Sequence, residues 1–153
     1  MGVIEERLAG LGLTLPAVAA PAGAYVPAVV SGSLVFTAGQ LPFVGGALPA
    51  TGKVGGEVSP EAAADLARTA ALNALAAAAS AIGSLDRVTR VVKATVFVAS
   101  APDFTGQPAV GNGASGLLVD AFGEPGRHAR SAVGVAVLPF DAPVEVELVL
   151  EFA

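Results

Sequence analysis

The sequence predicts an α+β fold in which a mixed β-sheet carries two helices on one of its faces. Strand-like and helix-like segments follow one another in the order β-β-α-β-α-β-β. Strand–helix–strand passages indicate crossover connections and short turns indicate hairpins, so parallel and antiparallel pairs are both expected. The 153 residues are 54% apolar. This is enough to fill the core of one domain, which we expect to span residues 1–153.

The N-terminal part is predicted to be an extension followed by a hairpin. The extension covers residues 1–20 and contains a short helix at residues 3–10. Residues 25–30 and 34–38 are rich in β-branched and aromatic side chains, which is typical of strands. The intervening Ser31-Gly32-Ser33 indicates a tight turn, so these strands are expected to pair.

The clearest helix is predicted over residues 62–81, after a glycine-rich loop at residues 44–56. Ser59 has the side chain of an N-cap, and Pro60 suits the first helical position. Gly83 is expected to end the helix, because glycine adopts the left-handed conformation of that position easily. The many alanines indicate close packing against a sheet.

A central strand and a second helix are expected next. Residues 90–99 are apolar at almost every position, which is typical of a strand covered on both faces. Residues 108–122 carry an apolar stripe of helical spacing, although Gly111, Gly113 and Gly116 weaken the helix prediction.

Two strands are predicted to complete the sheet. They cover residues 131–137 and 144–152, and a turn at residues 138–143 is expected to join them as a hairpin. The last strand alternates between apolar residues and glutamates, so one of its faces should be buried.

Composition excludes several classes of function. The chain has no cysteine and one histidine, which excludes disulfides, thiolate nucleophiles and histidine-rich metal sites. A net charge of −5 disfavours nucleic acid as the partner, and no apolar run is long enough to span a membrane. Glu5 and Glu6 lie where an export signal would be basic, so we expect a cytoplasmic protein.

Charged residues make up only 14% of the chain. In average globular proteins roughly a quarter of all residues are charged. One explanation of the low charged fraction is that copies of the chain associate and cover the apolar surface. The alternative explanation is a genome whose composition favours alanine and glycine.

Arg130 is the leading candidate for a functional side chain. By the strand period it shares a face with Ala132 and Gly134, so a small-walled pocket can hold its guanidinium against a carboxylate. The alternative is a surface arginine paired with a local acid. Glu145 can position water or be an exposed acid, and Tyr25 can supply a hydroxyl or fill the core. His128, in a Gly/Pro-rich loop, is expected to have only a loop role.

Five segments resemble the RidA family, also called YjgF or endoribonuclease L-PSP. They are residues 25–28 (Tyr-Val-Pro-Ala), 35–42 (Val-Phe-Thr-Ala-Gly-Gln-Leu-Pro), 92–98 (Val-Lys-Ala-Thr-Val-Phe-Val), 130–133 (Arg-Ser-Ala-Val) and 144–147 (Val-Glu-Val-Glu). Their order and spacing match the family over residues 22–152. The resemblance implies a chorismate-mutase-like fold and a homotrimer with clefts between subunits. It also implies hydrolytic deamination of 2-imino or enamine acids without metal or organic cofactor.

The resemblance also implies roles for individual residues. Arg130 matches the arginine that grips the substrate carboxylate, and Glu145 matches the glutamate that places the attacking water. Tyr25 and the backbone of Gly39 match positions that line the pocket, and Asn112 falls near a common asparagine.

Four departures from the family indicate a divergent branch. Ala132, expected at the substrate-binding site, stands where members often carry cysteine, and Gly134 stands where they often carry glutamate. The N-terminal extension and the longer 105–127 segment are further departures. They leave the substrate side chain open.

Three functions remain to be compared. The first is an enamine/imine deaminase that binds with Arg130 and positions water with Glu145. The second is a trimeric module that binds small carboxylates without turnover. The third, a ribonuclease, is disfavoured by the acidic balance and the lack of a histidine pair or a lysine and arginine cluster.

Overall fold

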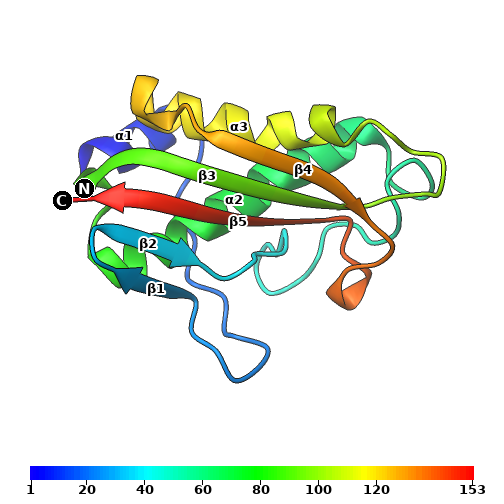
Figure 1. The fold of residues 1–153 in the computed structure, drawn as a ribbon, viewed down its shortest axis with the longest axis horizontal. Helices are drawn as coiled ribbons and strands as arrows, with labels where there is room; N and C mark the ends of the chain where they lie inside the picture. Colours follow the sequence, from blue (N-terminus) through cyan, green and yellow to red (C-terminus); the bar gives the residue numbers. More distant parts are fainter.

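The computed structural model describes residues 1–153 as a five-stranded mixed sheet with two long helices packed on one of its faces (Figure 1). This confirms the predicted α+β class. The elements are α1 (Val3–Gly10), β1 (Ala28–Ser31), β2 (Leu34–Thr37), α2 (Pro60–Ile82), β3 (Val88–Ala99), α3 (Gln107–Phe122), β4 (Ala129–Val135) and β5 (Val144–Phe152). Short 3-10 turns at Leu85–Arg87, Glu124–Gly126 and Pro139–Asp141 precede β3, β4 and β5.

The strands lie in the order β1-β2-β5-β3-β4. β1 and β2 form the predicted hairpin, and β5 pairs antiparallel with both β2 and β3. The hairpin predicted across residues 138–143 is wrong, because β4 pairs only with β3, in parallel. Since β5 enters the sheet between β2 and β3, the chain turns away from β4 through Pro139–Asp141.

Local sequence explains why α2 forms where it does. The Ser59 hydroxyl accepts a hydrogen bond from the Ala62 N–H at 3.1 Å, as an N-cap does, and Pro60 begins the helix. Gly83 follows the helix with a φ of +91°, a conformation that costs glycine little. Eight alanines of α2 are buried because the helix lies close to both α3 and the sheet.

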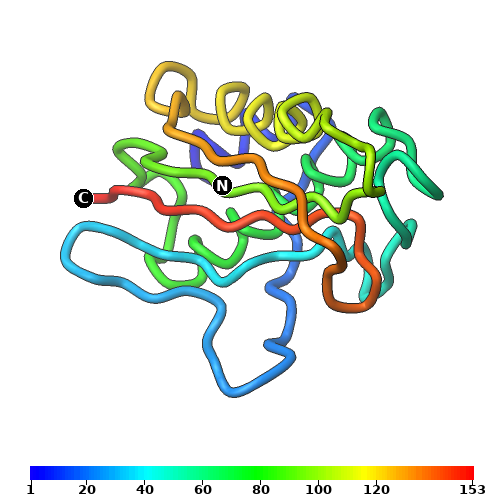
Figure 2. Tube along the Cα trace, turned by 45° about the vertical axis from the view of Figure 1, so that its right-hand side comes forward, coloured from blue at the N-terminus to red at the C-terminus, as the bar shows by residue number.

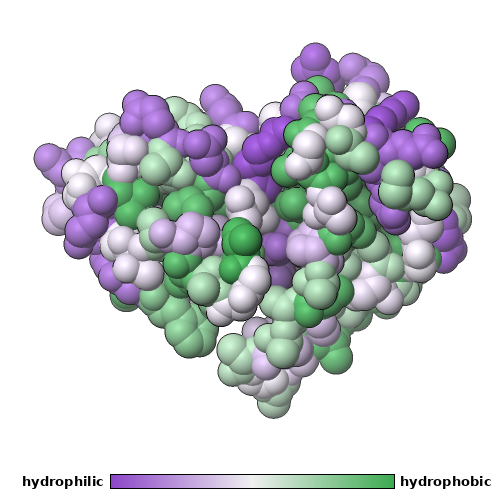
Figure 3. Space-filling view, turned by 180° about the vertical axis from the view of Figure 1, so that it is seen from behind, coloured by the Kyte–Doolittle hydropathy of each residue, from purple (hydrophilic) through white to green (hydrophobic).

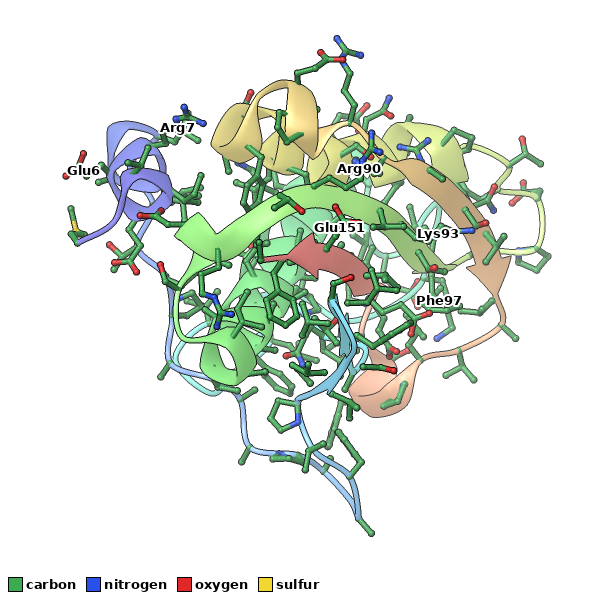
Figure 4. The ribbon with its side chains drawn as sticks, turned by 60° about the vertical axis from the view of Figure 1, so that its left-hand side comes forward. Glu6, Arg7, Arg90, Lys93, Phe97 and Glu151 are labelled. Carbon is green, nitrogen blue, oxygen red and sulfur yellow. The ribbon has the colours of Figure 1, made fainter.

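The sheet has one buried face and one open face. Residues of β3 that point to the helices are fully buried, as are alternate residues of β5 from Val144 to Leu150. On the other face no helix covers the strands. In Figure 4, Lys93 and Phe97 of β3 lie along this open face, together with Glu151 of β5. The helices therefore leave one whole face of the sheet for other contacts.

Two strand boundaries differ from the predictions in ways that matter for the site. β1 begins at Ala28 rather than at residue 25, so Tyr25 precedes the strand. β4 covers Ala129–Val135 rather than residues 131–137, so Arg130 lies inside the strand. β4 begins two residues earlier than predicted because Ala129 and Arg130 pair with β3. The local sequence does not show which strand will be the partner.

The N-terminal extension contains the predicted helix α1, which docks through Asp86. The Asp86 carboxylate accepts hydrogen bonds from the N–H groups of Val3 and Ile4, at 2.9 and 3.0 Å. After α1 the chain runs without regular structure to β1 and loops away from the sheet below the hairpin (Figure 2). The side opposite to the view of Figure 1 is hydrophilic along its upper edge and largely apolar below (Figure 3). No helix combines the length and apolarity needed to cross a bilayer.

Candidate functional site

Arg130 is held against α3 by three acceptors. Its Nη1 donates to Asn112 Oδ1 at 2.8 Å and to Ser115 Oγ at 3.2 Å, and its Nη2 donates to the Pro108 carbonyl at 3.3 Å. No carboxylate lies within ion-pair distance of the guanidinium, so the reading as a surface arginine paired with a local acid is wrong.

One edge of this guanidinium stays open. A guanidinium carries five N–H groups, and the three bonds use both hydrogens of Nη1 and one of Nη2. Nε–H has no partner within the chain and Nη2 makes one bond only, and Nε and Nη2 form the edge of the fork that matches a carboxylate. Arg130 therefore presents an unfilled anion-binding edge.

Small residues make room beside Arg130, as the sequence indicated. A Cβ added at Gly111 of α3 would lie 3.1 Å from Arg130 Nη1 and 3.2 Å from Ala132 Cβ. Ala132 is half-buried next to Arg130 on the helix-facing side of β4. We call Arg130, Asn112, Ser115 and Ala132 the arginine cluster.

His128 lies in the loop before β4, as expected, and its side chain also contacts α3. Its Nε2 lies 2.9 Å from Ser115 Oγ, and its Nδ1 lies 2.6 Å from the Gly126 carbonyl oxygen. The half-buried imidazole therefore contacts the arginine cluster through Ser115. The contact of Ser115 with Arg130 was not predicted, although its place one helical turn after Asn112 is a signal that both face Arg130.

Glu145 lies in a second place, a cavity of about 310 Å³ that we call the glutamate cavity. Gly39 forms part of its wall, and a Cβ added there would lie 2.8 Å from Glu145 Cδ and closer still to Oε2. The missing side chain at position 39 thus makes room for the carboxylate. The other lining residues are Ala19, Ala20, Pro21, Ala22, Tyr25, Pro27, Ala38, Gln40, Leu41, Phe43, Pro139 and Phe140.

The environment of Glu145 raises the pKa of its carboxyl above the usual value. Partial burial disfavours the charged form most, and the negative charge of Glu147 adds to the effect. A carboxylate with a raised pKa is a better proton acceptor at neutral pH than an ordinary one. The cavity therefore contains a group suited to accept a proton from water.

Tyr25 lines the glutamate cavity at its outer side and does not fill the core. Its side chain is 51% exposed, and its hydroxyl accepts a hydrogen bond from the Ala22 N–H at 3.0 Å. The hydroxyl can still donate to a ligand. On the inner side, the nearly buried Asn73 donates to the carbonyls of Leu41 and Phe43 and so fixes that wall.

Within one chain the arginine cluster and Glu145 lie on opposite faces of the sheet. Arg130 is opposite Ala94 of β3, which is buried under the helices. Glu145 is opposite Phe97, whose side chain lies on the open face (Figure 4). Paired residues share a face and neighbours along a strand alternate, so the two side chains point apart. A site that uses both needs a second copy of the chain.

No group of three or more histidine, cysteine, aspartate or glutamate side chains comes together with the geometry to hold a metal ion. The polar side-chain groups at both places are two amides, two hydroxyls, an imidazole, a guanidinium and a carboxylate. They suit hydrogen bonding to a small polar anion.

Comparison with known proteins agrees with the fold and with the segments identified in the sequence. Residues 5–152 match the family model described as YjgF/chorismate mutase-like, putative endoribonuclease. Protein TCP17 of Trypanosoma cruzi is 49% identical over 153 residues, which is 98% of this chain and 94% of that protein.

Two solved structures extend the comparison. Atu1372 of Agrobacterium tumefaciens, a protein of unknown function, superposes with a TM-score of 0.92 at 47% identity, covering 99% of this chain and 93% of that one. TdcF of Escherichia coli, solved with bound serine, superposes with a TM-score of 0.64 at 29% identity, covering 92% and 96%. The lower score against TdcF agrees with the divergent branch expected from the sequence.

Proposed function

We propose a function on the premise that the chain belongs to the YjgF/chorismate mutase-like family. It acts as a deaminase that hydrolyses reactive 2-imino or enamine acids to 2-oxo acids and ammonia. The observation that carries this proposal is the open Nε/Nη2 edge of Arg130, which is shaped for a carboxylate and free of any protein anion.

The reaction needs a bound carboxylate, an oriented water and a route for one proton. Arg130 grips the carboxylate of the imino acid, and Glu145 accepts a hydrogen bond from the water and takes its proton as oxygen bonds to C2. Glu145 returns that proton to the nitrogen, which gives a carbinolamine. The carbinolamine hydroxyl proton then passes to the nitrogen, ammonia leaves as the C2–N bond breaks, and the C2–O bond becomes the carbonyl of the 2-oxo acid. Imine hydrolysis has a low barrier, so orientation supplies enough catalysis without metal or cofactor.

Two copies of the chain supply one cleft. The arginine cluster of one copy faces the glutamate cavity of the next, and three copies close into a ring with three such clefts. The opposite orientation of Arg130 and Glu145 in one chain supports this arrangement. The proposal takes residues 1–153 as one domain and the cytoplasm as its compartment.

The relative TdcF supports the substrate class. It was solved with serine, whose carboxylate and 2-nitrogen have the same spacing as those of a 2-imino acid. Here part of the wall of the cavity that contains Glu145 is built from small apolar residues at the end of the N-terminal extension and just after it, Ala19 to Ala22. This wall favours a small, uncharged substrate side chain.

The proposal is tested by following ammonia and 2-oxo acid release from imino acids that an amino acid oxidase generates in situ. The wild-type chain should accelerate release, and Arg130→Ala should not. No acceleration with small, aliphatic or aromatic imino acids would contradict the deaminase proposal.

A binding module without turnover is the second candidate, because the same open edge of Arg130 would serve it. Glu145→Gln separates the two functions. In a deaminase, Glu145→Gln abolishes turnover and leaves carboxylate binding largely intact. In a binding module, neither the wild-type chain nor Glu145→Gln shows turnover. A net charge of −5 and a single histidine disfavour an endoribonuclease. Negligible binding to single-stranded RNA at both low and high salt would exclude that function.

A further inference from the structure

The only histidine of the chain is connected to Arg130 through a shared hydrogen-bond partner. His128 and Arg130 are linked through one hydroxyl, since Ser115 Oγ lies 2.9 Å from His128 Nε2 and 3.2 Å from Arg130 Nη1. Nothing in the proposed reaction uses either His128 or Ser115. Their placement nevertheless determines which way the hydroxyl points.

The hydrogen-bond chain has one consistent direction when the imidazole is neutral. A carbonyl oxygen can only accept, so the 2.6 Å contact with the Gly126 carbonyl assigns the imidazole proton to Nδ1. Nε2 is then an acceptor, and Ser115 must donate its proton to it. The lone pairs of Ser115 Oγ are left to accept from Arg130.

We infer that Ser115 and His128 are positioning residues that fix the Arg130 guanidinium with its Nε/Nη2 edge towards a carboxylate ligand. Without His128 as its acceptor, the serine hydroxyl can rotate so that its proton points at Nη1, which would leave Nη1 with one acceptor fewer. With the hydroxyl oriented, both hydrogens of Nη1 are bonded, and rotation about the Cζ–Nε bond would break both bonds. The identity of the ligand rests on the proposed function, whereas the fixed guanidinium does not.

Pre-orientation of this kind matters because a long arginine side chain loses rotational freedom when it binds a ligand. A guanidinium that is already fixed loses less on binding, so the carboxylate is held more tightly. Pre-orientation adds equally to the binding of substrate and transition state, so losing it while Arg130 is kept should raise KM and change kcat little.

Two NMR measurements on the protein without ligand test the inference. The single histidine gives an unambiguous long-range nitrogen–proton spectrum, which should show the Nδ1–H tautomer of the neutral ring. The second measurement is the rate at which the Arg130 Nη1 and Nη2 signals exchange as the guanidinium rotates. Ser115→Val should speed this exchange. Ser115→Thr is the control, because threonine has the same shape as valine but keeps the hydroxyl, and it should leave the exchange slow.

A predominant Nε2–H tautomer, or the same rotation rate in the valine and threonine variants, would overturn the inference. In the imino acid assay, Ser115→Val should raise KM by about tenfold, as expected for the loss of one hydrogen bond to a charged group, with kcat within about twofold. A fall in kcat at constant KM would also overturn it. Because the NMR readouts need no substrate, they distinguish a failure of this inference from a failure of the deaminase proposal.

Discussion

Gly113 of α3 should tolerate no side chain, because α3 lies against the backbone of α2 at this point. A Cβ at position 113 would lie 2.6 Å from the Ala64 carbonyl carbon and 3.1 Å from its Cα, whereas ordinary van der Waals contacts begin at 3.4 Å. Backbone atoms cannot rotate aside, so Gly113→Ala must push the two helices apart. Overpacking of this kind costs about 1–3 kcal/mol or more.

Gly116 on the same helix provides the matched control, because a Cβ there would meet nothing within 4 Å. Both substitutions gain about 1 kcal/mol of helix propensity, so the difference between the variants isolates the overpacking cost. That difference corresponds to about 2–12 °C in Tm at equal protein concentration, with Gly116→Ala the more stable variant. A Tm of Gly113→Ala at or above that of Gly116→Ala would refute the close-packing argument.

Three further predictions concern single carboxylates. Gly39→Ala should fold with little change in Tm but lose about 100-fold in deamination, because the new Cβ displaces the flexible Glu145 carboxylate; unchanged activity would contradict this. Glu147→Gln should lower the raised pKa of Glu145, so the acid limb of the pH–rate profile should move to lower pH; a limb that stays or moves up would argue against it. Asp86→Asn should speed amide hydrogen exchange in α1, because it removes the carboxylate that accepts from the Ile4 and Val3 N–H groups. These bonds hold the pKa of Asp86 below its usual value, so the stabilisation of α1 is lost as pH falls through that lowered pKa. Unchanged exchange in the variant would contradict the docking role.

Local sequence signals predicted most of the elements because their causes are local. The cap at Ser59, the helix end at Gly83 and the alternation in residues 144–152 depend on neighbours within one turn or one strand. The small neighbours of Arg130 followed from the strand period of two in the same way. These features appear in the structure where the sequence placed them.

Features set by distant parts of the chain were harder to predict. The turn at residues 138–143 has the composition of a hairpin, but β5 pairs with β2 and β3 instead of β4. Gly111 and Gly113 resemble helix breakers, although one makes room for Arg130 and the other for α2.

The contact of His128 with α3 could not be predicted for the same reason. Its partner Ser115 lies 13 residues away on another element. No local pattern contains that contact.

Subunit exchange tests whether one cleft combines Arg130 of one copy with Glu145 of another. Arg130→Ala and Glu145→Gln are each expected to be inactive in the imino acid assay. When the two variants are mixed at equal concentration and allowed to exchange subunits, about a quarter of the clefts in random trimers regain both residues. We predict that about a quarter of the wild-type activity returns. Mixed trimers without any regained activity would contradict a cleft built by two copies.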